Sequence, residues 1–285
     1  DIYLNDTTAD NWKDEARSWY FSTWGQYEAS KGFMGVFDGD GHTVSGIYLN
    51  VDNDGQVLGG LIPVIGEGGV VKNVGVVNSY LRGYDNKHGC GWIGAICGYS
   101  YYWENTIPGT LATISGCFAD KSVTVSGQCA GGIIGAGNPP IINNCGFTGK
   151  LEVKAADGKV AGIMGHDWDI KNSEGTAVDN GCINNCYTVG YEICGNMGQF
   201  WRSTGTLENL YSTIDCSNAT KLTPDQMKGT DAIANMAFDR LDWDFRYDGY
   251  PTPCVRANGY ASGTGTESDP YIIETEAQLK YLVTD

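Results

Sequence analysis

The sequence is poor in basic residues, in proline and in long apolar runs, and each shortage excludes a class of protein. Its 285 residues include 18 lysines and arginines against 34 aspartates and glutamates, a formal net charge of −16. Such a surface repels phosphate groups, so we expect no nucleic acid as a partner. Eight prolines without a Gly-X-Y period exclude collagen. No apolar run approaches the roughly 20 residues that span a bilayer, so we expect no membrane insertion in this segment.

Histidine is scarce, and the cysteines lack the spacing of a metal site. The three histidines lie far apart, and the ten cysteines include no CxxC pair. We therefore expect neither structural zinc nor any cofactor. The chain starts Asp1-Ile2-Tyr3-Leu4, which is not a signal peptide, and we interpret it as an excised or processed piece of a longer protein.

Glycine, by contrast, is abundant, with 41 residues spread along the whole chain. A motif of glycine followed by two or three apolar residues recurs. Its anchors are spaced 31, 41, 30 and 36 residues apart, at Gly60, Gly91, Gly132, Gly162 and Gly198. Recurrence at such a period predicts a repeat architecture.

A second motif follows each anchor: an apolar residue, a polar residue, asparagine or glycine, and another apolar residue. It occupies residues 71–74, 114–117, 142–145, 183–186 and 207–210. Short alternating runs such as 122–127 follow it. Alternation with β-branched residues favours strands, and asparagine or glycine between them suits a left-handed turn residue.

The distances between the two motifs predict a solenoid with inserts at one corner. From the second motif to the next anchor they are nearly constant, at 18, 16, 18 and 13 residues. From anchor to second motif they alternate, at 13, 25, 12, 23 and 11 residues, so the second and fourth repeats carry about a dozen extra residues. We predict an all-β solenoid of parallel coils; the alternative is a β-sandwich with coincidental glycines.

Three cysteines, Cys117, Cys145 and Cys186, share one position of the second motif. Stacked coils would place them in one column of the core. The sequence leaves two interpretations open: a column of reduced thiols that pack as small apolar residues, or disulfides between neighbouring coils.

Residues 37–47 read FDGDGHTVSGI, and residues 60–83 and 131–150 contain the glycine-anchored motif. The first stretch resembles the opening phrase, and the other two resemble repeat units, of GLUG-repeat regions, which occur in bacterial surface and adhesin-like proteins and in IgA-protease-type peptidases. Residues 222–230, with 243–245 and 249–251, resemble the closing segment. The resemblance implies a right-handed parallel β-helix, secreted and displayed on the cell surface. The long inserts and the many cysteines depart from the pattern and leave the ligand open.

The expected organisation has four parts. Residues 1–55 form an N-terminal cap and first coils, 56–220 the repeats, 221–260 a closing segment, and 261–285 a linker, strand and short helix. Six aromatic residues are expected to cap the open end of the coils: Trp12, Trp19, Tyr20, Phe21, Trp24 and Tyr27.

The last segment, 261–285, resembles the start of another such region, and residues 1–6 resemble the strand that normally follows it. Self-association through 261–285, which would cap a neighbouring module, is one hypothesis. Folding back onto residues 1–10 of the same chain is the other.

The two inserts hold the candidate ligand-binding residues. The first contributes Tyr99, Tyr101, Tyr102, Trp103 and Glu104, and the second contributes Asp167, Trp168 and Asp169. One coil per repeat would place the inserts two coils apart, roughly 10 Å. Aromatic rings beside carboxylates suit carbohydrate, because rings stack on sugar faces and carboxylates bind hydroxyls. The alternative is that these aromatics pack the inserts onto the coils.

A metal site and an enzyme are weaker alternatives. Asp52 and Asp54 resemble part of a calcium loop but lack its spaced glutamate, and a plain Asx turn is the preferred interpretation. Asp38 and Asp40 are expected as turn residues. Asp167 with Asp169, or Glu104 with Asp167, could form the carboxylate pair of a polysaccharide-degrading enzyme, but no hydrolase or nucleotide-binding motif accompanies them.

The sequence thus predicts a non-catalytic extracellular β-helix module of a bacterial surface adhesin that binds carbohydrate or a host glycoprotein. The alternative is a structural segment of a head-to-tail filament or stalk.

Overall fold

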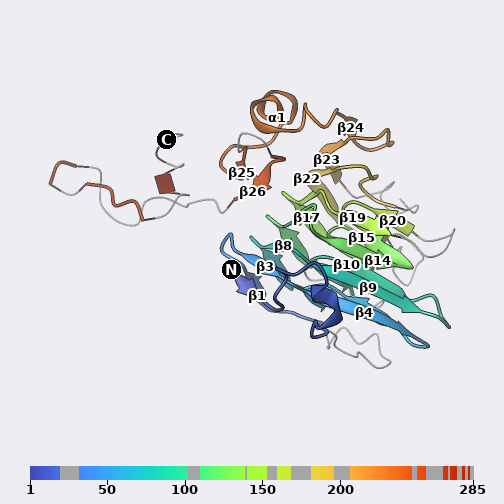
Figure 1. Cartoon of the computed structure of the whole chain (residues 1–285). Helices are drawn as coiled ribbons and strands as arrows, with labels where there is room; N and C mark the ends of the chain where they lie inside the picture. The colour runs from blue at the N-terminus through green and yellow to red at the C-terminus, as the bar shows by residue number, and fades with distance from the viewer. Residues whose placement is uncertain are drawn as a thin grey trace.

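A computed structural model describes most of the chain as successive coils of short strands (Figure 1). The described residues are 1–19, 32–101, 110–138, 140–152, 159–167, 181–195, 206–245, 249–254, 266–268, 270–274, 278–279 and 282. Almost every strand pair is parallel; only β25 (Trp243–Asp244) and β26 (Thr252–Pro253) pair antiparallel among the described strands. The predicted parallel β-helix is confirmed.

Each full coil passes through five strand positions in the same order. The first coil holds β2 (Val36–Asp38), β3 (Thr43–Ser45), β4 (Tyr48–Asn53), β5 (Val57–Gly59) and β6 (Ile62–Ile65). The second holds β7 (Val70–Lys72), β8 (Gly75–Val77), β9 (Tyr80–Asp85), β10 (Gly91–Gly94) and β11 (Cys97–Ser100). The third holds β12 (Thr113–Ser115), β13 (Phe118–Ala119), β14 (Thr124–Gly127), β15 (Cys129–Gly131) and β16 (Ile134–Gly137). The fourth holds β17 (Ile141–Asn143), β18 (Gly146–Phe147), β19 (Lys150–Glu152), β20 (Lys159–Ala161) and β21 (Met164–Asp167).

Stacking of these coils builds four parallel sheets. Sheet A has twelve strands, because the first two positions of each coil belong to one sheet. It also contains β1 (Ile2–Tyr3), β22 (Cys182–Thr188), β23 (Thr206–Ser212) and β24 (Thr220–Lys221). Sheet C is β4-β9-β14-β19, sheet D is β5-β10-β15-β20, and sheet B is β6-β11-β16-β21.

The second sequence motif marks the turn between the first two strand positions. Its leading apolar residues pair in register, from Val71 through Ile114, Ile142 and Ile183 to Leu207. The third residue is left-handed in every case, with φ between 52° and 60°: Asn73, Gly116, Asn144, Asn185 and Asn209. Asparagine and glycine tolerate this conformation best, which explains the recurring residue type.

The alignment of the first motif was wrong at one anchor. Gly91 pairs with Val57, so it begins strand β10. Cys97 pairs with Ile62 and with Ile134, which makes Ala95 the equivalent of Gly60 and Gly132. Gly91-Trp92-Ile93-Gly94 imitates the motif because β10 itself begins and ends with glycine. In the fifth repeat, Cys194 forms a bridge to Met164, and Gly198 lies outside the described residues.

A row of glycines explains why the motif recurs. Gly98, Gly135 and Gly165 occupy equivalent positions on sheet B, directly against the backbone of sheet D. A Cβ atom on Gly135 would lie 2.4 Å from the nitrogen of Ile93, and one on Gly165 would lie 2.7 Å from the carbonyl oxygen of Ala130. Only glycine allows the two backbones to approach this closely.

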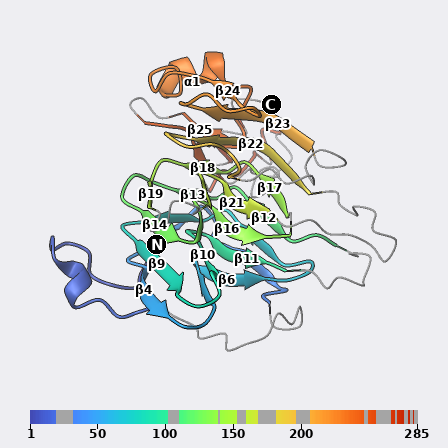
Figure 2. The same cartoon turned by 90° about the vertical axis from the view of Figure 1, so that its right-hand side faces the viewer.

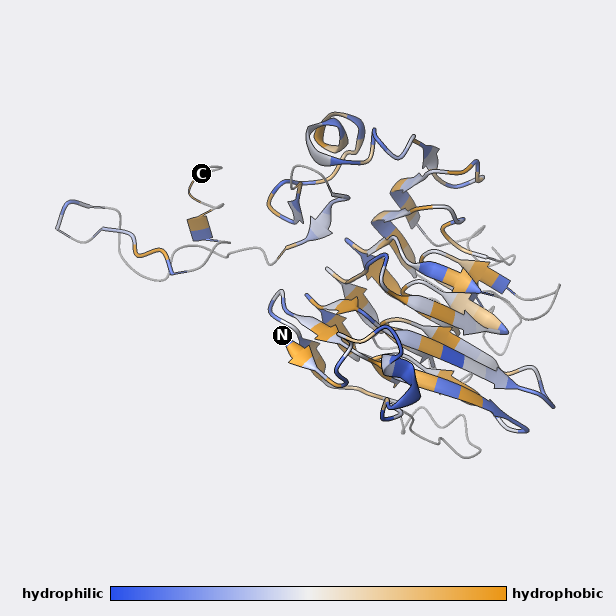
Figure 3. Cartoon of the chain, in the orientation of Figure 1, coloured by the Kyte–Doolittle hydropathy of each residue, from blue (hydrophilic) through white to orange (hydrophobic). Residues whose placement is uncertain are grey.

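The core inside the coils is built from stacked apolar residues (Figure 3). Cys117, Cys145 and Cys186 form a fully buried column, and all ten cysteines are free thiols. Each Sγ in the column donates to the carbonyl oxygen two residues earlier, at 3.3 Å, 3.3 Å and 3.1 Å. The column of reduced thiols is the arrangement that the structure contains.

The closing segment packs on the outside of sheet A at the end of the coil stack (Figure 2). It includes α1 (Gly229–Asn235), and its core is the stacked pair Phe238 and Trp243, with ring centroids 4.4 Å apart. Tyr187 of β22 anchors it, because its hydroxyl donates to the carbonyl oxygen of Pro251 at 2.7 Å.

Two of the six N-terminal aromatics are described, and both contact the first coil. Trp12, in the 3-10 helix η1 (Trp12–Asp14), meets the ring of Tyr48 edge-on at 5.9 Å. The backbone N–H of Trp19 donates to the carbonyl oxygen of Tyr48 at 2.7 Å, and its side chain packs against the core. Tyr20, Phe21, Trp24 and Tyr27 lie outside the described residues.

The described part of the last segment stands away from the coils in Figure 1. Gln278, Leu279 and Leu282 have helical backbone. No helix formed by the described residues is both long and apolar enough to cross a membrane.

Candidate binding surface along one edge of sheet B

Both inserts leave sheet B at the same register position. Tyr99 pairs with Ala136, which pairs with His166; Ser100 pairs with Gly137, which pairs with Asp167. One strand, β16, lies between the two exit points, so they are about 10 Å apart. The predicted spacing of the inserts is confirmed at their first residues. Tyr102, Trp103, Glu104, Trp168 and Asp169 lie outside the described residues.

Tyr99 belongs to an apolar cluster outside the main core. Its ring stacks on Trp92 at 4.5 Å, and the ring of Tyr101 lies 6.1 Å from it. A row of outward side chains on sheet D (Leu58, Trp92, Cys129) meets a row on sheet B (Val64, Tyr99, Ala136). Tyr99 is 7% exposed, so it packs the cluster, whereas Tyr101 is partly exposed beside the first insert.

The same two rows end in a lysine and a histidine. Lys159 continues the row of Cys129, and His166 continues the row of Ala136. The ammonium of Lys159 donates to Nε2 of His166 at 2.9 Å. Burial, together with the positive charge of Lys159, lowers the pKa of His166 to about 4. The imidazole is therefore neutral at pH 7, which suits its role as an acceptor.

Sequence reasoning missed Trp92 and Lys159 as members of this surface. Alternation within β10, β15 and β20 could have placed Trp92, Cys129 and Lys159 on one outward row. The misaligned anchor at Gly91 hid this pattern, because it assigned Trp92 to the first, glycine-anchored motif.

Asp167 lies in the row next to Tyr99 and is only 3% exposed. Its register neighbours are Gly137 and Ser100, whose hydroxyl donates to the carbonyl oxygen of Asn138. Both carboxylate pairs considered for catalysis contain a partner outside the described residues, Asp169 or Glu104.

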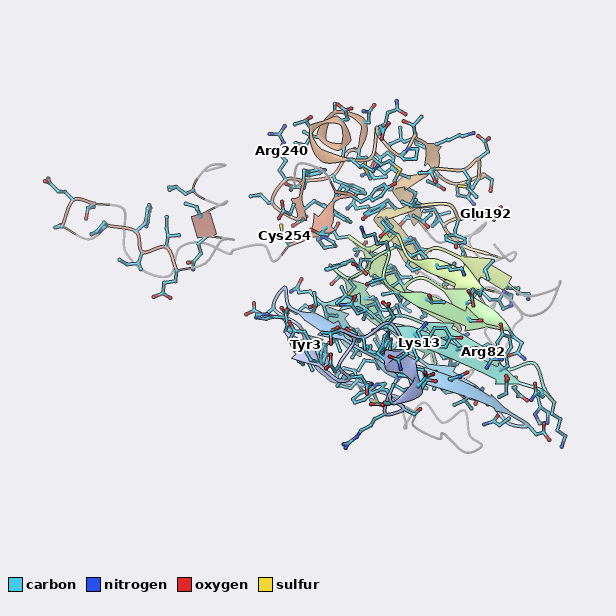
Figure 4. The ribbon with its side chains drawn as sticks, in the orientation of Figure 1. Tyr3, Lys13, Arg82, Glu192, Arg240 and Cys254 are labelled. Carbon is cyan, nitrogen blue, oxygen red and sulfur yellow. The ribbon has the colours of Figure 1, made fainter. Side chains whose placement is uncertain are left out.

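The aspartates of the calcium alternative are engaged in other contacts or exposed. Asp52 accepts from the guanidinium of Arg82 at 2.6 Å, on the outer face of sheet C (Figure 4). Asn53 Oδ1 accepts from the backbone N–H of Gly55 at 3.0 Å, which is an Asx turn, and Asp54 is exposed. Within the described ranges, no group of three or more His, Cys, Asp or Glu side chains could hold a metal ion. Asp38 caps its own turn by accepting from the N–H of Asp40 at 3.0 Å.

A pocket of about 510 Å³ lies at the first coil, away from the inserts. It is lined by residues 3–8 together with Ser45 and Asn78. The side chain of Asn5 is committed to holding this loop, since it donates to the carbonyl oxygen of Gly46 at 2.7 Å and accepts from the N–H of Arg17 at 2.8 Å.

No protein family, curated protein or solved structure was found to match this chain. Its function is therefore inferred from its own register, contacts and composition.

Proposed function

We propose that this chain is a non-catalytic extracellular module of a bacterial surface protein of adhesin type. It binds carbohydrate, free or on a host glycoprotein, through the two inserts that follow the carboxyl ends of strands β11 and β21 in sheet B. The observation that carries the proposal is the register that starts both inserts at equivalent positions with one coil between them.

The composition of the inserts supports carbohydrate as the ligand. Residues 101–104 of the first insert and Trp168 and Asp169 of the second combine aromatic rings with carboxylates, the groups that recognise the apolar faces and hydroxyls of sugars. The strands of sheet B are rigid and fix the spacing between the two inserts. The net charge of −16 favours neutral glycans over sulfated or sialylated ones, since like charges repel.

A non-catalytic role is favoured by the state of the described carboxylates. Asp167 is buried, and Asp52 is held in an ion pair with Arg82. A carboxylate that acts as general acid or base must reach the substrate.

Glycan-array binding tests this function. We expect wild type to bind neutral glycans, and the double variant Trp103→Ala/Trp168→Ala to lose about five- to 150-fold in affinity, since each stacked ring contributes roughly 0.5–1.5 kcal/mol. Tyr3→Ala is the matched control, because Tyr3 is 74% exposed and lies at the first coil. Absence of binding by wild type, or equal binding by the double variant, would contradict the proposal.

A structural segment of a filament or stalk is the second candidate function. It is favoured by the location of the exposed apolar residues, which gather on the first coil and on the C-terminal segment. The two functions are compatible in one protein, because the inserts follow β11 and β21 and not the first coil or the C-terminal segment, where the exposed apolar residues lie.

A further inference from the structure

The large apolar side chains that are exposed among the described residues fall into two groups. One lies at the N-terminal edge of the coils: Ile2, Tyr3, Met34 and Val36, which are 51–74% exposed. The other lies on the C-terminal segment: Tyr271, Ile272, Ile273, Leu279 and Leu282, which are 37–54% exposed. Figure 3 shows apolar residues on β1 and on the projecting segment, and Figure 4 shows Tyr3 at the margin of the coils. Exposed apolar patches on soluble proteins mark surfaces that bind a partner.

At the N-terminal edge of the first coil, β2 and β5 have no segment paired on their outer side among the described residues, but all three residues of β5 are buried, whereas Val36 of β2 is 66% exposed. Ile2 and Tyr3 of β1 pair with β3, the N–H of Trp19 bonds to β4, and Phe33 forms a bridge to Ile65 of β6. These contacts lie below the second, third and fifth strand positions of the first coil. Below β2, in the first position, no strand is present among the described residues, since β2 pairs with β7 alone.

The strands at this first position share a simple pattern. In the first four coils each has three residues, and the middle one points into the core: Phe37, Val71, Ile114 and Ile142. The last three of these are fully buried, whereas Phe37 stays partly exposed at the open edge. One further strand with an apolar middle residue would cover Phe37.

The C-terminal segment supplies a matching strand. Tyr271-Ile272-Ile273 has three residues with an apolar middle residue, and isoleucine is a strong strand former. Ile272 already has the backbone of an isolated β-bridge. Placed beside β2, Ile272 would extend the column of Phe37, Val71 and Ile114. Leu279 and Leu282, three residues apart on helical backbone, form one apolar face available to Ile2 and Met34.

We propose that residues 271–273 of one copy add as a parallel strand to the outer edge of β2 in a second copy. An exposed strand edge accepts such an addition through its backbone groups, and the side-chain pattern gives specificity. The two surfaces differ, so the contact is head-to-tail and leaves one free edge and one free segment at the ends of every assembly. The proposal concerns assembly and does not rest on glycan binding.

Two charge-introducing variants test it. Val36→Lys places a charge on the edge at a residue that is 66% exposed, and Ile272→Asp places one on the segment at a residue that is 43% exposed. Sedimentation velocity of wild type should show oligomers that grow with concentration, and each variant alone should remain monomeric. An equimolar mixture should form a dimer and nothing larger, because Val36→Lys keeps an intact segment and Ile272→Asp keeps an intact edge.

The matched controls are Val36→Ile and Ile272→Val, which keep an apolar β-branched residue and should assemble as wild type does. Circular dichroism and melting establish that every variant is folded. If the segment folds back onto its own edge, wild type stays monomeric and Ile272→Asp lowers its melting temperature; that outcome overturns the proposal. A mixture that forms no dimer also overturns it. Glycan binding measured on monomeric Val36→Lys separates failure of assembly from failure of the proposed function.

Discussion

At the scale of single residues, the left-handed turn after the first strand decides where each coil bends. Asn144, Asn185 and Asn209 have φ between 52° and 54°. The side chains of the last two also bond from coil to coil, since Asn209 Nδ2 donates to Asn185 Oδ1 at 2.9 Å. This turn was predictable, because few residue types tolerate positive φ and short polar side chains can bond along a stack.

His166 gives a pH dependence that can be measured. Its pKa is about 4 in the folded protein, against an ordinary value of 6.5, because the ring is buried beside Lys159. Between pH 6.5 and 4 the unfolded chain takes up a proton at His166 that the folded protein does not. We therefore expect the free energy of unfolding to fall as pH decreases through this window. His166→Gln should reduce that slope in urea denaturation at a series of pH values.

The carboxylates with lowered pKa values, Asp38 and Asp85, act in a different window. Hydrogen bonds hold the pKa of each below 3.8, so the stability that they contribute is lost only as pH falls below that value.

An unchanged slope between pH 6.5 and 4 in His166→Gln would show that the folded histidine is not held neutral.

At the scale of elements, the contact between sheets B and D depends on glycine. A Cβ at position 135 would meet the nitrogen of Ile93 at 2.4 Å and the carbonyl oxygen of Gly98 at 2.7 Å. Both are backbone atoms and cannot rotate away. Gly135→Ala should therefore lower the free energy of unfolding by about 1–3 kcal/mol, the typical effect of overpacking.

Gly55→Ala is the matched control for this prediction. The nearest atom to its Cβ would be Asn53 Oδ1 at 3.9 Å, so we expect a change within about 0.5 kcal/mol. Urea denaturation of the two variants measures both values. Equal stability of the two would mean that sheets B and D separate without penalty.

The position of the two inserts was predictable from the sequence, but the side-chain contacts of the surface beside them were not. The alternating distances between motifs located both inserts at one corner, and the register of β11 and β21 agrees. The contact between Trp92 and Tyr99 could not be predicted, because it joins outward rows of two different sheets. Distance along the chain says nothing about how two neighbouring sheets meet.

At the scale of the whole molecule, coils contact mainly their neighbours, so stability is a sum of contacts between adjacent coils. Interior strands are paired on both sides, as β12 is with β7 and β17, whereas β1 pairs with β3 alone among the described strands.

Hydrogen exchange tests this arrangement. Amides of β12 and β17 should exchange more slowly than those of β1, because opening an edge strand breaks one ladder and opening an interior strand breaks two. Mass spectrometry of peptic fragments measures the rates. Uniform exchange along the coils would contradict a stack of nearest-neighbour contacts.

The sequence by itself determined the parallel coils, the asparagine turns and the corner that carries the inserts, because all three depend on local conformation repeated at a regular interval. The tertiary structure alone decided the packing of the closing segment on Tyr187 and the pairing of Lys159 with His166. It also decided that, among the described strands, β2 pairs with β7 alone. These features depend on which surfaces meet once the coils are stacked, and a repeat in one dimension leaves that unspecified.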